Sequence, residues 1–144
     1  MSLPNEPDFA LVRIGSGPTP PIVCGIESIS LNQTANTSDR FRRDCAKPGE
    51  VPTRKVRVTG RQWDVTGSGV INIDEFDTFE DSLGTSKAYT IEFGKRDGSD
   101  AGVIVGKFVG NAVMTAANLN MGDDEGTAEI TLAGEGPIVW TPTP

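Results

Sequence analysis

The sequence contains one candidate nucleophile with basic neighbours. Cys45 lies close in the chain to Arg42, Arg43 and Lys47, and nearby cations stabilise the thiolate form of a cysteine. A nucleophilic cysteine also needs a general base. The chain has no histidine, the residue that most often fills this role. We therefore expect no catalytic residue and no enzymatic activity.

Three short stretches have the composition of ligand loops but not the required pattern. The Gly-Ser-Gly triplets at 15–17 and 67–69 do not continue into the sequences of phosphate-binding loops, so they predict turns. The stretch 72–77 resembles a calcium loop, but Asp77 stands where that loop needs glycine. Two cysteines without histidine also disfavour a zinc site. The sequence thus predicts no cofactor and no metal.

The bulk composition predicts a single folded domain over residues 1–144. Hydrophobic residues make up 36% and charged residues 23%, which is typical of a globular chain that can bury a core. No apolar run approaches the roughly 20 residues of a membrane-spanning helix, and residues 1–8 lack the features of a secretory signal. We therefore expect the protein in the cytoplasm of the cell that makes it, with Cys24 and Cys45 reduced.

The elements that hold these residues read mainly as β-strands. Apolar residues recur at every second position in 89–93 and 128–132, which is the period of a strand, and 9–14 is a short apolar run. Asp97-Gly98 and Gly122-Asp123 are favourable hairpin turns. Between these turns, 102–121 is apolar on both parities, which predicts a strand covered on both faces. In a domain of this size, a neighbouring subunit is a candidate for the second cover.

A single amphipathic helix is predicted from Asp74 to Leu83. Asn72 with Glu75 forms a potential capping box, and Gly84 is a favourable stop. Phe76, Phe79 and Leu83 recur at helical spacing and form an apolar stripe that packs on the sheet. The opposite face is more acidic than capping requires: Asp74, Glu75, Asp77, Glu80 and Asp81.

Residues 33–54 show no clear period and predict a long loop, a feature that is usually functional or disordered. Positive charge concentrates here. Residues 40–57 contain seven basic and two acidic side chains, a net charge of +5. The rest of the chain contains six basic and 18 acidic side chains, a net charge of −12. The loop could bind nucleic acid, reach an acidic patch on another copy, or be a solvated surface loop. No folded nucleic-acid motif accompanies it. Its candidate contact residues are Arg40, Phe41, Arg42, Arg43, Lys47, Arg54 and Lys55.

The order of these elements resembles the major tail tube proteins of long-tailed, siphovirus-type bacteriophages and of gene transfer agents. The resemblance extends over residues 20–138. It is carried by V-T-G at 58–60, W-D-V-T-G-S-G at 63–69, and the closing T-A-E-I-T-L-A-G-E-G at 127–136. It implies a mainly β fold, a small β-sandwich or half-barrel with one short flanking helix, that forms a shared β-barrel when copies assemble into a ring.

The resemblance also implies a function. Hexameric rings would stack into a hollow tube around a tape-measure protein, bounded by a tail terminator and a distal tail protein. DNA would pass down the lumen without specific binding. The subunit would be made and assembled in the bacterial host cytoplasm and reside in the virion tail. A flexible N-terminal arm (about 1–8) and an extended C-terminal tail (about 137–144) would flank the domain.

Within such a tube, the charged groups acquire expected roles. The basic loop would meet the acidic helix of a copy in the adjacent ring, through the residues named above. Polar strand faces with Asp64, Glu92 and Glu129 would line the lumen, since phosphate adheres to Lys and Arg but not to carboxylates. The alternative for these faces is contact with bulk solvent outside the tube.

Two other functions remain open at this point. A tail terminator or a tube-like secretion subunit would share the same fold. A carbohydrate-binding β-sandwich would need a platform of exposed aromatic residues, and the chain has only two tryptophans and one tyrosine.

Overall fold

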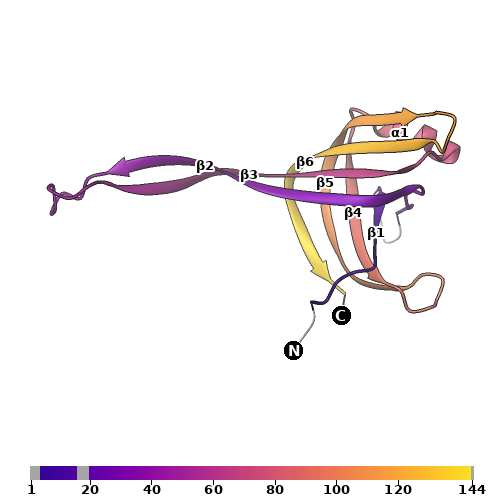
Figure 1. Cartoon of the computed structure of the whole chain (residues 1–144), viewed down its shortest axis with the longest axis horizontal. Helices are drawn as coiled ribbons and strands as arrows, with labels where there is room; N and C mark the ends of the chain where they lie inside the picture. The colour runs from indigo at the N-terminus through magenta and orange to yellow at the C-terminus, as the bar shows by residue number, and fades with distance from the viewer. Residues whose placement is uncertain (1–3, 16–19, 144) are drawn as a thin grey trace. The chain divides into compact units, whose positions relative to one another are not determined.

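Six β-strands and one α-helix are present in the computed structural model, which describes residues 4–15 and 20–143 (Figure 1). The strands are β1 (Phe9–Ile14), β2 (Ile26–Arg42), β3 (Thr53–Val70), β4 (Ser86–Lys95), β5 (Val103–Asn120) and β6 (Thr127–Pro142). A 3-10 turn, Ile73–Glu75, leads into the helix α1, Phe76–Ser82. The strands form one sheet in the order β1-β4-β5-β6-β3-β2. The expected mainly β fold with one short helix is confirmed.

The chain divides into two compact units, the body and the hairpin. The body comprises residues 1–32 and 63–144, and the hairpin is Gln33–Gln62. The hairpin consists of the last part of β2, the first part of β3 and the connection between them, with the two strands side by side (Figure 1). Within the described residues, no helix is long and apolar enough to cross a membrane.

The core of the body lies on one face of the sheet. Val12 pairs with Ile91 across β1 and β4, and Leu132 of β6 pairs with both Met114 of β5 and Val65 of β3. All five side chains are fully buried. They are apolar residues at alternate strand positions, so the period-two pattern in the sequence selects this face.

The helix begins and ends close to the predicted positions. The Asn72 carboxamide accepts a hydrogen bond from the N–H of Asp74 (3.2 Å), and Gly84 follows the helix with φ +75°, a conformation that favours glycine. Phe79 packs into the core at 4% exposure, whereas Leu83 is 46% exposed. The apolar stripe is therefore narrower than predicted, because the backbone is already extended at Leu83.

The long loop predicted at 33–54 is wrong over most of its length. Strand β2 continues to Arg42 and β3 begins at Thr53, so only the connection between them lacks strand structure. Every residue of the hairpin except Gly60 is exposed. With no face buried within the chain, these strands have no apolar alternation, and the period that identifies a strand is missing.

The extended C-terminal tail predicted at 137–144 is also wrong for most of its residues. Strand β6 runs to Pro142, which pairs with Gly106 of β5. Pro137 lies where the β5–β6 register shifts, between the pairs Asn111–Glu135 and Val109–Val139. A proline has no N–H for the ladder, but a bulge or an open strand edge tolerates it. The prolines at 137 and 142 therefore led to the prediction of a tail where the chain forms a strand.

The N-terminal arm predicted at 1–8 includes residues 1–3, which lie outside the described residues. The rest has no strand structure, although it is attached to the body. The N–H of Asp8 bonds the carbonyl of Gly94 (2.8 Å), and the Asp8 carboxylate accepts from the N–H of Arg96 (2.9 Å).

Candidate assembly surfaces

The face of the sheet opposite the core, called here the outer face, carries all three carboxylates predicted to line a lumen. Asp64 pairs with Ala133, Glu129 pairs with Ser68, and Glu92 pairs with Lys107. Each of these positions alternates with a core residue, so the three side chains share the outer face.

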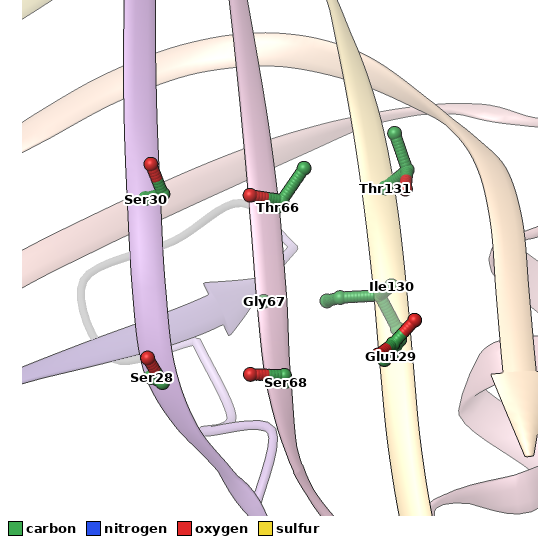
Figure 2. Close-up of a pocket in the computed structure, with 8 residues that line it drawn as sticks. All are labelled: Ser28, Ser30, Thr66, Gly67, Ser68, Glu129, Ile130 and Thr131. Atoms are coloured by element: carbon green, nitrogen blue, oxygen red, sulfur yellow. The ribbon is translucent and has the colours of Figure 1, made fainter. Parts of the chain in front are cut away.

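Hydroxyl groups surround one of these carboxylates. A hollow of about 290 Å³ crosses β2, β3 and β6 on the outer face (Figure 2). Thr66 lies opposite Thr131, and Ser68 lies opposite Glu129. The residues that line the hollow are Ser28, Ser30, Thr66, Gly67, Ser68, Glu129, Ile130 and Thr131. The sequence reasoning did not select these hydroxyls, although Ser and Thr alternate at 28–30 and 66–68.

Glu92 has a different environment from the other two carboxylates. It forms an ion pair with Arg13 of the neighbouring strand β1. Its exposed fraction is 9%, whereas Asp64 is half-buried and Glu129 is exposed. The negative charge of Glu92 is therefore balanced locally, and Asp64 and Glu129 are the open carboxylates of this face.

The outer face is apolar where β5 pairs with the end of β6. Val109 lies directly opposite Val139, and these side chains are 37% and 55% exposed. These two residues form the valine patch. The opposite face of the same strand carries the buried Ala112 and Met114, so β5 has apolar residues on both faces, but the cover predicted for the second face is not supplied within the described residues.

The hairpin concentrates positive charge. It has eight basic and three acidic side chains, a net charge of +5, and the remainder of the chain has five and 17, a net of −12. A shallow hollow of about 520 Å³ is lined by Arg40, Arg42, Lys55, Val56 and Arg57. Of the residues predicted for this contact, Arg54 lies 3.8 Å from the carboxylate of Asp39, and Phe41 is 69% exposed.

The acidic face of the helix is open to solvent. Asp74, Asp77, Glu80 and Asp81 are exposed. Glu75 is half-buried, and its carboxylate accepts a hydrogen bond from the N–H of Cys24 (3.3 Å). The capping box predicted for Glu75 is therefore replaced by a contact with the segment before β2. Within the described part of the chain, no group of three or more Cys, Asp or Glu side chains is arranged to hold a metal ion.

Comparison with solved structures identifies this arrangement of strands. Similar structures include tubes and tails of phages, gene transfer agents and contractile injection systems. A chain of the PVC sheath–tube complex, an extracellular contractile injection system in its extended state, superposes with a TM-score of 0.67 at 17% identity, over 96% of this chain and 92% of that one. The chain has the tail-tube fold.

Two further structures agree. A chain from the tail of an empty gene transfer agent particle, solved with C6 symmetry, gives a TM-score of 0.64 at 14% identity, covering 91% of this chain and 94% of that one. A chain from the structure of the PVC sheath/tube terminator in its extended state gives a TM-score of 0.65 at 17% identity, covering 98% of this chain and 97% of that one. No family model matches the sequence, and no curated protein matches it. At these identities, the three-dimensional fold carries the likeness, and it agrees with the resemblance seen in the motifs at 58–69 and 127–136.

Proposed function

We propose that this chain is the tube subunit of a tail-like particle, in which hexameric rings stack into a hollow tube. The observation that carries the proposal is the tail-tube fold with an uncovered valine patch on an otherwise polar outer face. An exposed valine patch on a central strand needs a cover, and a lateral neighbour in a ring supplies one. Closing the sheets of six copies into a shared β-barrel also removes the free edges at β1 and β2.

The stacking of rings uses the charge asymmetry. The basic hairpin of one copy contacts the acidic face of α1 on a copy in the adjacent ring. Each exposed ion pair contributes less than about 1 kcal/mol, but six equivalent contacts act together at each ring junction. Tubes should therefore dissociate into rings at about 1 M salt, where the Debye length falls to about 3 Å.

The open carboxylates and hydroxyls of the outer face line the lumen in this proposal. DNA moves along such a surface because it meets few cations that would bind its phosphates. Asp64 and Glu129 carry most of the effect, and the paired Glu92 carries less. Replacing Asp64 and Glu129 by Lys should leave tubes intact and block DNA delivery, whereas Asp123→Lys with Asp124→Lys, in the exposed connection between β5 and β6, changes the net charge equally and should leave delivery normal. Normal delivery by the double variant would exclude these residues from the lumen.

The remaining partners follow from the tube. A tape-measure protein sets its length, a tail terminator closes one end and a distal tail protein the other. The subunit is made and assembled in the bacterial host cytoplasm and resides in the virion tail. It needs no cofactor and performs no catalysis.

A terminator that closes a tube is the second candidate, because a chain from the structure of the PVC sheath/tube terminator superposes almost as well as the chain from the sheath–tube complex. Negative-stain electron microscopy of the purified protein separates the two functions. A tube subunit forms hollow tubes at low salt, whereas a terminator forms single rings at every concentration. Monomers alone, at high concentration and low salt, would contradict both.

A further inference from the structure

The two cysteines of the chain lie on the two surfaces that meet between rings in the proposed tube. Cys24 belongs to the body and Cys45 to the hairpin. Both thiols are free and exposed. Neither thiol is therefore needed for packing within the subunit, and both are accessible to a second copy.

Cys24 is hydrogen-bonded to the beginning of the acidic helix. Its N–H donates to the carboxylate of Glu75 (3.3 Å). The next residue, Gly25, accepts a hydrogen bond from the N–H of Val70 (3.0 Å), and a Cβ on Gly25 would lie 3.5 Å from the Cβ of Asn72, the residue that caps the helical turn. These contacts place Cys24 beside the beginning of the acidic helix, and its thiol is exposed.

Cys45 is held at the tip of the basic hairpin by two consecutive turns. The N–H of Lys47 bonds the carbonyl of Asp44 (3.1 Å), and the N–H of Glu50 bonds the carbonyl of Lys47 (3.1 Å). The Asp44 carboxylate accepts from the N–H of Ala46 (2.9 Å). Cys45 is the second residue of the first turn, so its position in the tip is defined by backbone geometry.

We propose that Cys45 of one copy lies beside Cys24 of a copy in the adjacent ring, and that oxidation joins them in an inter-ring disulfide. This inference rests on the proposed function and names a residue pair within its stacking contact. The charge complementarity between the cations around Cys45 and the carboxylates around Cys24 selects a second copy as the partner. A disulfide requires the two Cα atoms to approach within about 7 Å.

The chemistry needs an oxidant, and a small-molecule disulfide such as oxidised glutathione supplies it. One cysteine thiolate attacks the glutathione disulfide and releases one reduced glutathione. The second cysteine thiolate then attacks the mixed disulfide, forms the inter-ring bond and releases the second glutathione. Two thiols are oxidised, one glutathione disulfide is reduced, and the two thiol protons pass to the released glutathiones. The bond therefore forms after the particle leaves a reducing cytoplasm.

The geometry of the contact determines which products form. Each copy donates Cys45 to one neighbour and presents Cys24 to another, so the contact is heterologous and does not close along the tube axis. Cross-linked products therefore form a ladder that continues past six copies. A contact between copies of the same ring would close at six, and a bond within one chain would give a monomer.

The experiment treats assembled wild-type protein with oxidised glutathione and compares non-reducing gels with electron micrographs. Wild type should give tubes and a ladder beyond the hexamer that a reducing agent collapses to the monomer. Cys24→Ser and Cys45→Ser should each form normal tubes and lose the ladder. A mixture of these two variants should stop at the dimer, because each chain then has a single thiol.

The outcomes separate this inference from the proposed function. Tubes without a ladder, a ladder that ends at six, or a dimer formed by either serine variant alone would overturn the cysteine pairing and leave the tube intact. Absence of tubes from wild type and from both serine variants would instead contradict the proposed function.

Discussion

The body and the hairpin are built on opposite principles. The body buries its apolar side chains on one face of the sheet, whereas 29 of the 30 hairpin residues are exposed. The body is acidic and the hairpin is basic. An isolated two-stranded hairpin is at best marginally stable in water. The body therefore has a core of its own, whereas the hairpin buries no face within the chain; in the proposed tube, another copy supplies its stabilising contacts.

Substitution in the body core should have the largest effect on the stability of the subunit. Trp63 is 3% exposed, and its indole N–H donates to the carbonyl of Gly136 (3.2 Å). Its ring lies directly over Gly134, where a Cβ would come within 2.2 Å of the ring. We expect Trp63→Ala to lower the free energy of unfolding by about 3–5 kcal/mol, measured by urea denaturation. A loss below about 1 kcal/mol would contradict the central place of Trp63 in this core.

One strand offers a matched comparison of the two units. Val65 and Val58 both belong to β3, but Val65 is fully buried in the body and Val58 is 61% exposed in the hairpin. Val65→Ala should cost about 2 kcal/mol, from the lost transfer free energy and the cavity. Val58→Ala should change stability by less than about 0.5 kcal/mol. Equal costs in urea denaturation would show that the hairpin has a core of its own.

A buried hydroxyl should produce a smaller, pH-dependent effect. Tyr89 and Ser82 are fully buried, and among the described residues neither hydroxyl meets the geometry of a hydrogen bond. Burial raises the pKa of Tyr89 above its usual value of about 10, and the nearby Ser82 hydroxyl partly opposes the rise. Removal of an unsatisfied polar group should make Tyr89→Phe more stable than wild type by about 1 kcal/mol at neutral pH.

The raised pKa of Tyr89 also predicts that the free energy of unfolding of the body decreases at alkaline pH. The folded chain holds the Tyr89 proton more tightly than the unfolded chain does. The stabilisation from this difference is complete below about pH 10 and is lost as pH rises through the folded-state pKa. Urea denaturation between pH 8 and pH 11 should show a decline for wild type that is shallower in Tyr89→Phe. If wild type and Tyr89→Phe lose stability equally with rising pH, the decline comes from titration of other groups.

Charge reversal in the hairpin should have the smallest effect on the subunit and a complete effect on stacking. Arg42 and Arg43 are exposed, so replacing both by Glu should change the free energy of unfolding by less than about 0.5 kcal/mol. Tubes seen by electron microscopy should be lost, because these residues then repel the acidic helix. Reversal of Lys95 and Arg96 in the body changes the net charge equally and should leave tubes intact.

A compensating change tests the pairing itself. Asp77→Lys with Asp81→Lys, introduced into the chain that carries the hairpin reversal, should restore the tubes. Rescue by these helix substitutions would support contact between the two surfaces. Rescue by Asp123→Lys with Asp124→Lys, exposed residues outside the helix that change the net charge equally, would instead reduce the effect to net charge alone.

The sequence alone predicts a feature correctly where the residues that determine the feature belong to the same segment of the chain. The alternation of Ala128, Ile130 and Leu132 predicts a one-sided strand, and all three are buried. Asn72 predicts the start of the helix through its own side chain. The acidic body and basic hairpin are likewise properties of composition. Each of these features depends on residues adjacent in the chain.

Only the tertiary structure decided the features that depend on distant residues. The hairpin strands carry no apolar period because no face of them is buried, and β6 passes through Pro137 because a register shift with β5 accommodates it. The sequence around Glu92 contains no partner for its carboxylate, but in the folded chain Arg13 of β1 forms an ion pair with it. The order of strands in the sheet likewise depends on pairing between distant segments. In each case the cause is a partner that the local sequence does not contain, and the proposed tube extends the same rule to partners in other copies.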